Sequence, residues 1–196
     1  MTLLLISLLV LTASHLVPSA PPVKSRLIAL MGRPWFYTVY SVVSVLALAA
    51  VVAAYRAADP ALLWLPWPGA RPVALLLMPV ALFLVVCRLT TRPSAVRRGI
   101  YRITAAPGSL GVLIWTLVHL ANVGAARTVV LFAAFAVIAL AALIKNVRMA
   151  PKSASTEGSV WSEIGWVRPA GAILLYIALL HLHPLVIGVD PLAGLT

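Results

Sequence analysis

The sequence is poor in charge, and acidic residues are the scarcest of all. Only 4 of its 196 residues are Asp or Glu, and charged residues together make up 10% of the chain, against about a quarter in soluble domains. With 63% hydrophobic residues and a mean hydropathy of +1.07, the chain lacks the surface of a water-soluble particle. We therefore expect a membrane protein whose basic residues set its orientation and do not bind nucleic acid.

Cysteine and membrane-embedded carboxylates are the next absences. The single cysteine, Cys87, excludes an internal disulfide framework and any cysteine-rich zinc or iron–sulfur site. The four acidic residues, Asp59, Glu157, Glu163 and Asp190, all lie outside the apolar runs. Proton-relay pumps, carboxylate ion sites and paired-carboxylate hydrolases need such groups within the membrane. These function classes are therefore not expected.

Six apolar runs are long enough, or nearly so, to cross a bilayer as helices, which takes roughly 17–25 residues. They cover residues 2–17, 36–55, 73–87, 109–123, 128–144 and 169–187. Proline and glycine separate the runs, and Pro79 inside the third run predicts a kink there. We expect an all-α integral membrane protein, a bundle of six transmembrane helices forming a single domain over residues 1–196.

The distribution of basic residues predicts the orientation. Twelve of the 15 Lys and Arg fall in the first, third and fifth gaps between the runs, and three fall in the second and fourth. Because basic loops stay in the cytoplasm, both termini are expected on the outer, periplasmic side. The longest polar gap, residues 145–168, carries Trp161 and Trp166, which predict a short helix at the membrane interface.

With Asp, Glu, Lys and Arg all outside the predicted spans, histidine is the residue type that remains as a candidate ligand inside them. His15, His119, His181 and His183 all lie there, and neutral imidazole is a common metal ligand and an axial ligand of haem iron. Without carboxylates or a second cysteine at depth, a bare metal site would be all-histidine. Two histidines from different helices can instead hold one haem, which the composition favours over zinc or copper. His181 and His183 are two positions apart, so at most one of them faces the bundle interior.

The predicted fourth span concentrates small and polar residues on one side. Gly108, Gly111, Trp115, His119 and Asn122 follow one another at intervals of three or four residues, which is one face of a helix. The glycines would let a neighbouring helix or a flat macrocycle approach, and Asn122 would form a hydrogen bond to a group that supports a metal ligand. The competing interpretation is a small-residue packing seam with one buried, hydrogen-bonded histidine.

Several short segments, in order and spacing, resemble the NnrU-like family of bacterial membrane proteins, relatives of the plant and algal 15-cis-zeta-carotene isomerase. The segments are Ser14-His15, Leu27-Ile28-Ala29-Leu30-Met31-Gly32, Tyr40-Ser41, Leu110-Gly111, Trp115-Thr116-Leu117-Val118-His119-Leu120-Ala121-Asn122, His183-Pro184 and Gly188-Val189. Each is short, so their order carries the specificity. The resemblance covers nearly the full length.

This resemblance implies a multi-pass protein of the bacterial inner (cytoplasmic) membrane that binds haem b between His15 and His119. It implies cis-trans isomerisation of an apolar polyene or a denitrification-linked redox role. Trp115 would then shape the haem pocket. We also expect three arginines to reach the haem propionates from the cytoplasmic side: Arg97, Arg98 and Arg102.

The chain departs from the family pattern at two places. The Arg-His-Pro sequence usual before the fourth span reads Ala105-Ala106-Pro107 here. The cysteine that precedes the second haem histidine of the isomerase by three residues is replaced by Thr116, which cannot supply a thiolate. Isomerisation by the same ligand exchange is therefore less expected than haem binding.

Two further questions stay open from sequence. His15 and His119 are expected to differ in depth by roughly 5–10 Å, counted at 1.5 Å per helical residue, which a tilted haem plane or tilted helices could absorb. Whether His181 or His183 replaces His15 as a ligand is not decided by the sequence. The alternative function is a non-catalytic subunit or assembly factor of a larger respiratory or photosynthetic membrane complex. The apolar surface of residues 128–144 would suit lipid or such a partner equally well.

Overall fold

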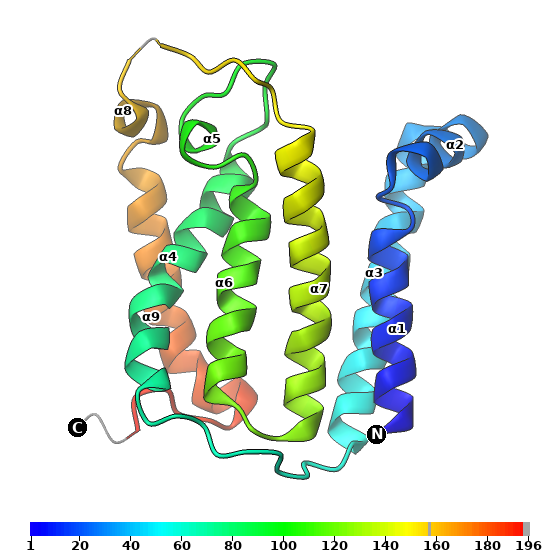
Figure 1. Ribbon diagram of the computed structural model, residues 1–196, viewed down its shortest axis with the longest axis vertical. Coiled ribbons are helices and arrows are strands. Elements are labelled where there is room, and N and C mark those ends of the chain that lie inside the picture. The colour runs from blue at the N-terminus through cyan, green and yellow to red at the C-terminus, as the bar shows by residue number, and fades with distance from the viewer. Residues whose placement is uncertain (157, 194–196) are drawn as a thin grey trace.

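The computed structural model describes residues 1–156 and 158–193, and these fold into a bundle of helices (Figure 1). A helix forms at each of the six predicted runs, with ends within four residues of those expected: α1 (Thr2–Leu16), α3 (Arg33–Ala57), α4 (Ala70–Thr90), α6 (Pro107–Asn122), α7 (Ala126–Arg148) and α9 (Val167–Ile187). Three further helices lie in the predicted gaps: α2 (Pro21–Met31), α5 (Ile100–Ile103) and α8 (Val160–Ile164). Of these, only a short helix near Trp161 was predicted. Glu157 lies outside the described residues.

Four helices are each long and apolar enough to cross a membrane: α3, α4, α7 and α9. The pair α1 and α2 passes the same test together, but the two helices are bent by 80° at the break between them, so they form a broken span or a re-entrant segment. By length and composition, the described chain therefore has four or five spans. It is a multi-pass helical membrane protein.

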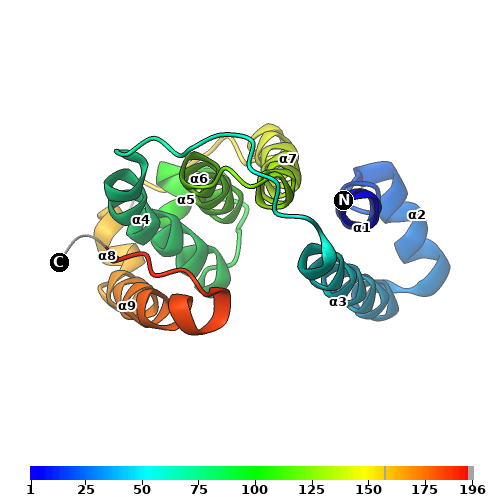
Figure 2. The ribbon, with the colours of Figure 1, turned by 90° about the horizontal axis from the view of Figure 1, so that it is seen from below.

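The long helices are arranged so that α7 is central. It packs against α6 on one side and α1 on the other, while α4 packs against α6 and α9, and α3 packs against α1. The start of α1 and the end of α9 lie at one end of the bundle, and α2, α5 and α8 lie at the other (Figures 1 and 2). The end that carries α2, α5 and α8 is the upper end below.

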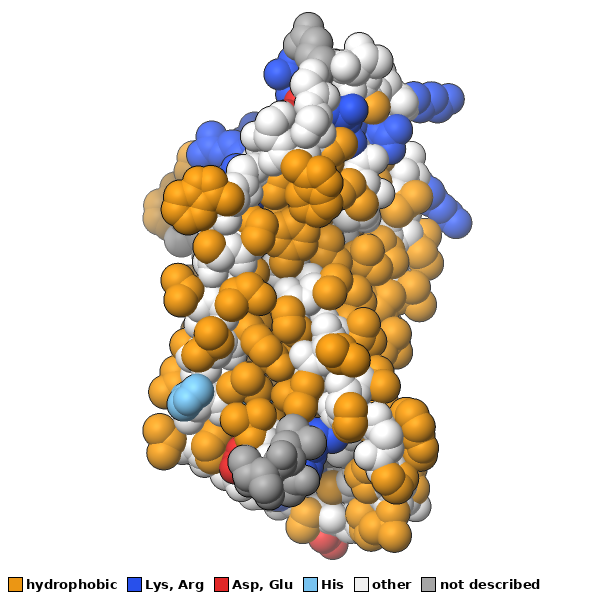
Figure 3. Space-filling view, turned by 90° about the vertical axis from the view of Figure 1, so that its left-hand side faces the viewer, with side chains coloured by type: hydrophobic (Ala, Val, Ile, Leu, Met, Phe, Trp, Pro, Cys, Tyr) orange, Lys and Arg blue, Asp and Glu red, His pale blue; other side chains and the backbone are white. Residues whose placement is uncertain are grey.

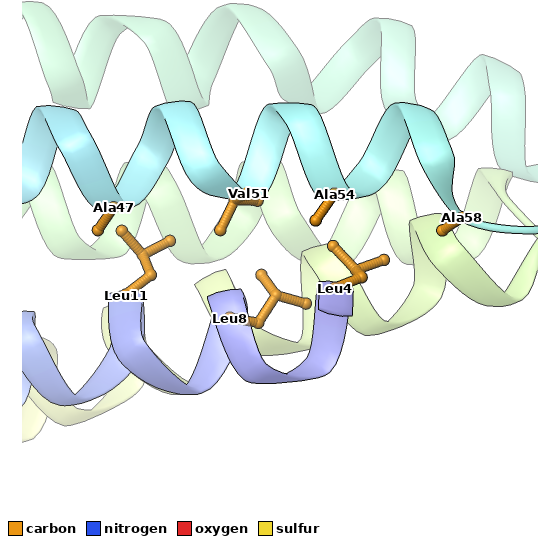
Figure 4. Packing of buried hydrophobic residues seen from close by; sticks show 7 residues of the cluster. All are labelled: Leu4, Leu8, Leu11, Ala47, Val51, Ala54 and Ala58. Atoms are coloured by element: carbon orange, nitrogen blue, oxygen red, sulfur yellow. The ribbon is translucent and has the colours of Figure 1, made fainter. Parts of the chain in front are cut away.

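The α1–α3 pair is held by leucines packed against small residues (Figure 4). Leu4, Leu8 and Leu11 are buried and recur at helical spacing on α1. The facing positions on α3 and just beyond it are Ala47, Val51, Ala54 and Ala58, and five side chains of α7 pack against the same cluster. Small residues let helix backbones approach closely within a membrane, which explains why α1 joins the bundle through this face.

Pro79 lies inside α4, and the helix continues through it. Proline has no N–H, so it leaves the carbonyl oxygen of Leu75, one turn earlier, without its helical donor. The hydroxyl of Tyr176 on α9 donates to this oxygen over 3.0 Å. The Leu75 carbonyl, which would be costly to leave without a donor in lipid, is thereby hydrogen-bonded, and the same bond links α9 to α4.

Charge and apolar surface are segregated along the bundle. Figure 3 shows hydrophobic side chains over the middle of one face and Lys and Arg gathered toward the upper end. The twelve basic residues of the odd-numbered gaps belong to this end: Lys24, Arg26, Arg33, Arg88, Arg92, Arg97, Arg98, Arg102, Lys145, Arg148, Lys152 and Arg168. The apolar belt indicates contact with lipid tails, and the basic end indicates a membrane surface.

Candidate functional site

His119 lies in the lower part of α6 and faces α7. Its ring stacks on Phe132 with the centroids 4.6 Å apart, and Trp115 lies one turn away with its ring centroid at 5.2 Å. The Nδ1 atom bonds to the carbonyl oxygen of Trp115 over 2.7 Å. Because a carbonyl can only accept, Nδ1 carries the hydrogen and Nε2 keeps its lone pair for another partner.

The predicted face of small and polar residues on α6 contacts two helices, α4 and α7. A Cβ on Gly108 would meet Arg88 of α4, and one on Gly111 would lie 2.6 Å from the carbonyl oxygen of Ala81 on α4. Asn122 donates to the carbonyl oxygen of Ala70 over 3.0 Å. Gly108, Gly111 and Asn122 thus form a packing seam with α4, whereas Trp115 and His119 turn toward α7.

His183 is positioned by the end of α9. Gly188 ends the helix in the left-handed conformation, with φ of 79°, which glycine adopts without strain. The turn brings the carbonyl oxygen of Val189 back to within 2.7 Å of the Nδ1 of His183. The His183-Pro184 and Gly188-Val189 segments therefore act together, fixing the ring with its Nε2 free.

His119 and His183 both lie toward the lower ends of their helices, α6 and α9. Helix α9 runs obliquely, so its lower end passes behind α6 in Figure 1. The two histidines are more than 60 residues apart in the chain. Both rings are half-buried, and each uses Nδ1 to bond a backbone carbonyl, the arrangement usual for histidines that bind a metal through Nε2.

His15 and His181 have other surroundings. His15, next to the last residue of α1, bonds Leu11 through Nδ1 over 2.9 Å, and its ring lies 5.8 Å from that of Tyr40 on α3. His181 bonds the carbonyl of Ile177 over 2.9 Å and is exposed on α9. Of the pair on α9, His183 is the more buried one.

His15 and His119 are not brought together. His15 lies 13 residues above the start of α1, and His119 lies three residues above the lower end of α6, so their heights differ by on the order of 10–15 Å. Helix α7 also lies between α1 and α6. Two ligands of one haem must face the same iron at the same height, so this arrangement does not fit a haem held by these two residues.

The three predicted propionate partners lie at the upper end and differ in role. Arg97 lines a cavity there. Arg98 borders the end of α8. Arg102 lies 4.0 Å from the carboxylate of Glu163 and donates to the carbonyl oxygen of Gly158 over 2.9 Å. None of these arginines is near His119, which is at the lower end of α6.

Thr116 occupies the place of the isomerase cysteine. Its side chain is fully buried, and its hydroxyl donates to the carbonyl oxygen of Leu113 over 2.8 Å. Cys87 is buried on α4 among upper-end residues that include Tyr101 and Ile164. Within the described residues, no three His, Cys, Asp or Glu side chains gather as a metal site. The thiol exchange of the isomerase therefore has no counterpart at His119.

These features define a class: a multi-pass helical membrane protein with two ordered histidines from distant helices in its apolar lower half. The chain belongs to the NnrU protein family, whose model matches residues 3–191, nearly the whole chain. The predicted family resemblance is thus confirmed. Neither curated proteins nor solved structures give a significant match.

The sequence left open whether His181 or His183 takes the place of His15. The His183-Pro184 and Gly188-Val189 segments, taken alone, indicate the end of a helix. What the sequence did not predict is the bond between the His183 ring and the Val189 carbonyl across that helix end.

Proposed function

We propose that this protein is a membrane-embedded haem b protein in which His119 and His183 are the two axial ligands. One observation carries the proposal: His119 and His183 lie in the lower parts of α6 and α9, each with Nδ1 bonded to a backbone carbonyl 2.7 Å away. Neutral imidazole coordinates iron through its remaining nitrogen. The apolar setting suits a macrocycle that is itself largely apolar.

The residues of the site have distinct tasks in this proposal. The carbonyl oxygens of Trp115 and Val189 hold the two rings in one tautomer and orientation. Phe132 supports the His119 ring by stacking, and Trp115 closes the space between α6 and α7, where its ring also meets Phe132. When bound, the haem would supply one-electron redox chemistry.

Fixed coordination by two histidines favours electron transfer as the role, which agrees with the denitrification-linked redox function that the resemblance implies. Polyene isomerisation needs a coordination position that opens, and the residue that would exchange with histidine in the isomerase is Thr116 here. Its hydroxyl is already bonded to Leu113. We therefore place isomerase activity second.

We further propose six spans, with both termini on the outer side of the bacterial inner membrane. In this arrangement α1 crosses as part of the bent α1–α2 pair, and α6, although only 16 residues long, crosses between α4 and α7. The start of α1 and the end of α9 lie at the same end of the bundle, and this and the basic upper end support the orientation.

The visible absorption spectrum of the purified protein tests the haem proposal. We expect a Soret band in the wild type, which His119→Ala and His183→Ala each abolish or reduce at least tenfold. His181→Ala is the matched control, because it removes an exposed imidazole two residues away on the same helix, and it should leave the band unchanged. A band that survives His183→Ala but is lost in His15→Ala would support the His15–His119 pair instead.

The alternative of a non-catalytic subunit or assembly factor has a different signature. It predicts that gently solubilised protein elutes in a stoichiometric complex with other membrane proteins and carries no visible absorption. Haem extraction and quantification then show whether the preparation contains any haem. If it contains none, haemin is added: a haem protein that lost a weakly held cofactor rebinds it, whereas a non-catalytic subunit does not.

A further inference from the structure

A cavity of about 510 Å³ lies at the upper end, where four helices begin or end. The turn between α1 and α2, the ends of α4 and α7, and the start of α6 surround it. Because these are the ends of membrane-spanning helices, the cavity lies at the level of a membrane surface. His119 is eleven residues below Gly108 on α6, about 16 Å away, so the cavity is separate from the proposed haem.

The lining of the cavity is strongly cationic. Lys24, Arg88, Arg97 and Lys145 contribute to it, and among the described residues that line it none is acidic. Four like charges around one cavity repel each other, and their partial removal from water costs desolvation free energy as well. A bound anion with more than one charge would offset both terms.

Neutral donors complete the lining. Asn146 and Ser109 are part of it, and Asn146 donates to the hydroxyl of Ser109 over 3.3 Å, which leaves that hydroxyl able to donate to another acceptor. Ser25 and Ser94 also line the cavity, but their hydroxyls donate to the carbonyl oxygens of Pro22 and Val96. Gly108 and Ser109 also place the first turn of α6 at the cavity. The first N–H groups of a helix have no partner within it and favour anions.

Two of the basic side chains that line the cavity are held in place by neighbouring elements. The Nζ of Lys145 donates to the carbonyl oxygen of Ser19 over 3.4 Å and so ties α7 to the α1–α2 turn. The stem of Arg88 passes where a side chain on Gly108 would stand, since a Cβ there would lie 2.7 Å from its Cγ. The Nε of Arg97 is buried and has no hydrogen-bond partner within the described part of the chain.

We propose that this cavity binds a phosphate group, presented either by the headgroup of an anionic phospholipid or by a water-soluble phosphorylated molecule. Phosphate matches the lining because it carries several acceptor oxygens and up to two charges, which Lys, Arg, hydroxyl and helix N–H donors bind together. The location at the membrane surface makes both sources accessible.

Binding is tested on the purified full-length protein with two probes. Inorganic phosphate is titrated against chloride at equal ionic strength while thermal unfolding is followed, and phosphatidylglycerol is compared with phosphatidylcholine by native mass spectrometry. We expect wild-type protein to bind at least one phosphate probe. Lys24→Gln, Arg97→Gln and Lys145→Gln should each weaken its binding about tenfold, the effect of one charge-assisted contact.

Arg92→Gln and Lys152→Gln are the matched controls, because they remove a positive charge from the same end outside the cavity lining. They should retain binding within about twofold. Binding of phosphatidylglycerol alone identifies a lipid site, and binding of inorganic phosphate identifies a soluble ligand. The proposal is overturned if neither probe binds, or if cavity and control variants lose binding equally. None of these measurements depends on the visible spectrum, so the haem proposal can fail independently.

Discussion

Gly188 shows how one backbone conformation determines what a distant side chain can do. Its left-handed φ of 79° returns the chain so that Val189 accepts from His183. Without this acceptor, the His183 ring would be free to adopt either tautomer and several rotamers. The functional side chain and the residue that orients it are thus six positions apart, with the helix terminus between them.

Gly111 carries the first prediction. A Cβ at this position would lie 2.6 Å from a backbone oxygen of α4 and 3.0 Å from Val85, and backbone cannot move aside cheaply. Gly111→Ala should therefore lower the free energy of unfolding by about 1–3 kcal/mol, measured by thermal or denaturant unfolding in detergent. Gly171→Ala is the control, since nothing lies within 4 Å of the added atom. Equal behaviour of the two variants would contradict a close α4–α6 contact.

Individual residues also show what sequence alone predicts. The spacing on α6 correctly placed Gly108, Gly111 and Asn122 on a shared face, because helical periodicity is a local property. It did not predict that Trp115 and His119 turn to α7, where both rings meet Phe132. Which neighbour covers each part of a helix depends on the order of helices in space, and local spacing carries no information on that order.

At the scale of helices, the Pro79–Tyr176 pair carries the second prediction. Tyr176→Phe removes the hydroxyl that donates to the Leu75 carbonyl and should destabilise the protein by about 1–2 kcal/mol. Pro79→Ala restores a backbone N–H at this position, so adding Tyr176→Phe to Pro79→Ala should cost less than it does alone. A double-mutant cycle of unfolding free energies measures the difference. Additive effects would show that the hydroxyl does not compensate for the proline.

Helix ends were predicted well where proline and glycine mark them. The α1 helix ends just before the Pro18–Pro22 segment, and α6 and α7 are separated at Gly124. Helix α2 was missed, because residues 21–31 combine two prolines and two basic residues, a composition that resembles a loop. Helix α2 starts at proline, lies at 80° to its predecessor and packs against α3, a contact that local composition does not reveal.

At the scale of the whole molecule, the charge asymmetry carries the third prediction. In a Cys87→Ser background, whose original thiol is buried, Asp59→Cys should react with a membrane-impermeant maleimide in intact cells. Ser153→Cys should react only after lysis, because it lies at the basic end, which the positive-inside rule keeps in the cytoplasm. The reverse labelling pattern would place both termini in the cytoplasm and overturn the proposed orientation.

The central position of α7 has a consequence for how the chain is made. The leucine face of α1 leaves the ribosome first, yet part of its packing surface comes from α7, which is synthesised more than 100 residues later. Until then, α3 covers only part of that face, so the α1–α3 pair can form early but can dock on the other helices only after α7 has been made. Synthesis of α7 is therefore the step that joins the two parts of the bundle.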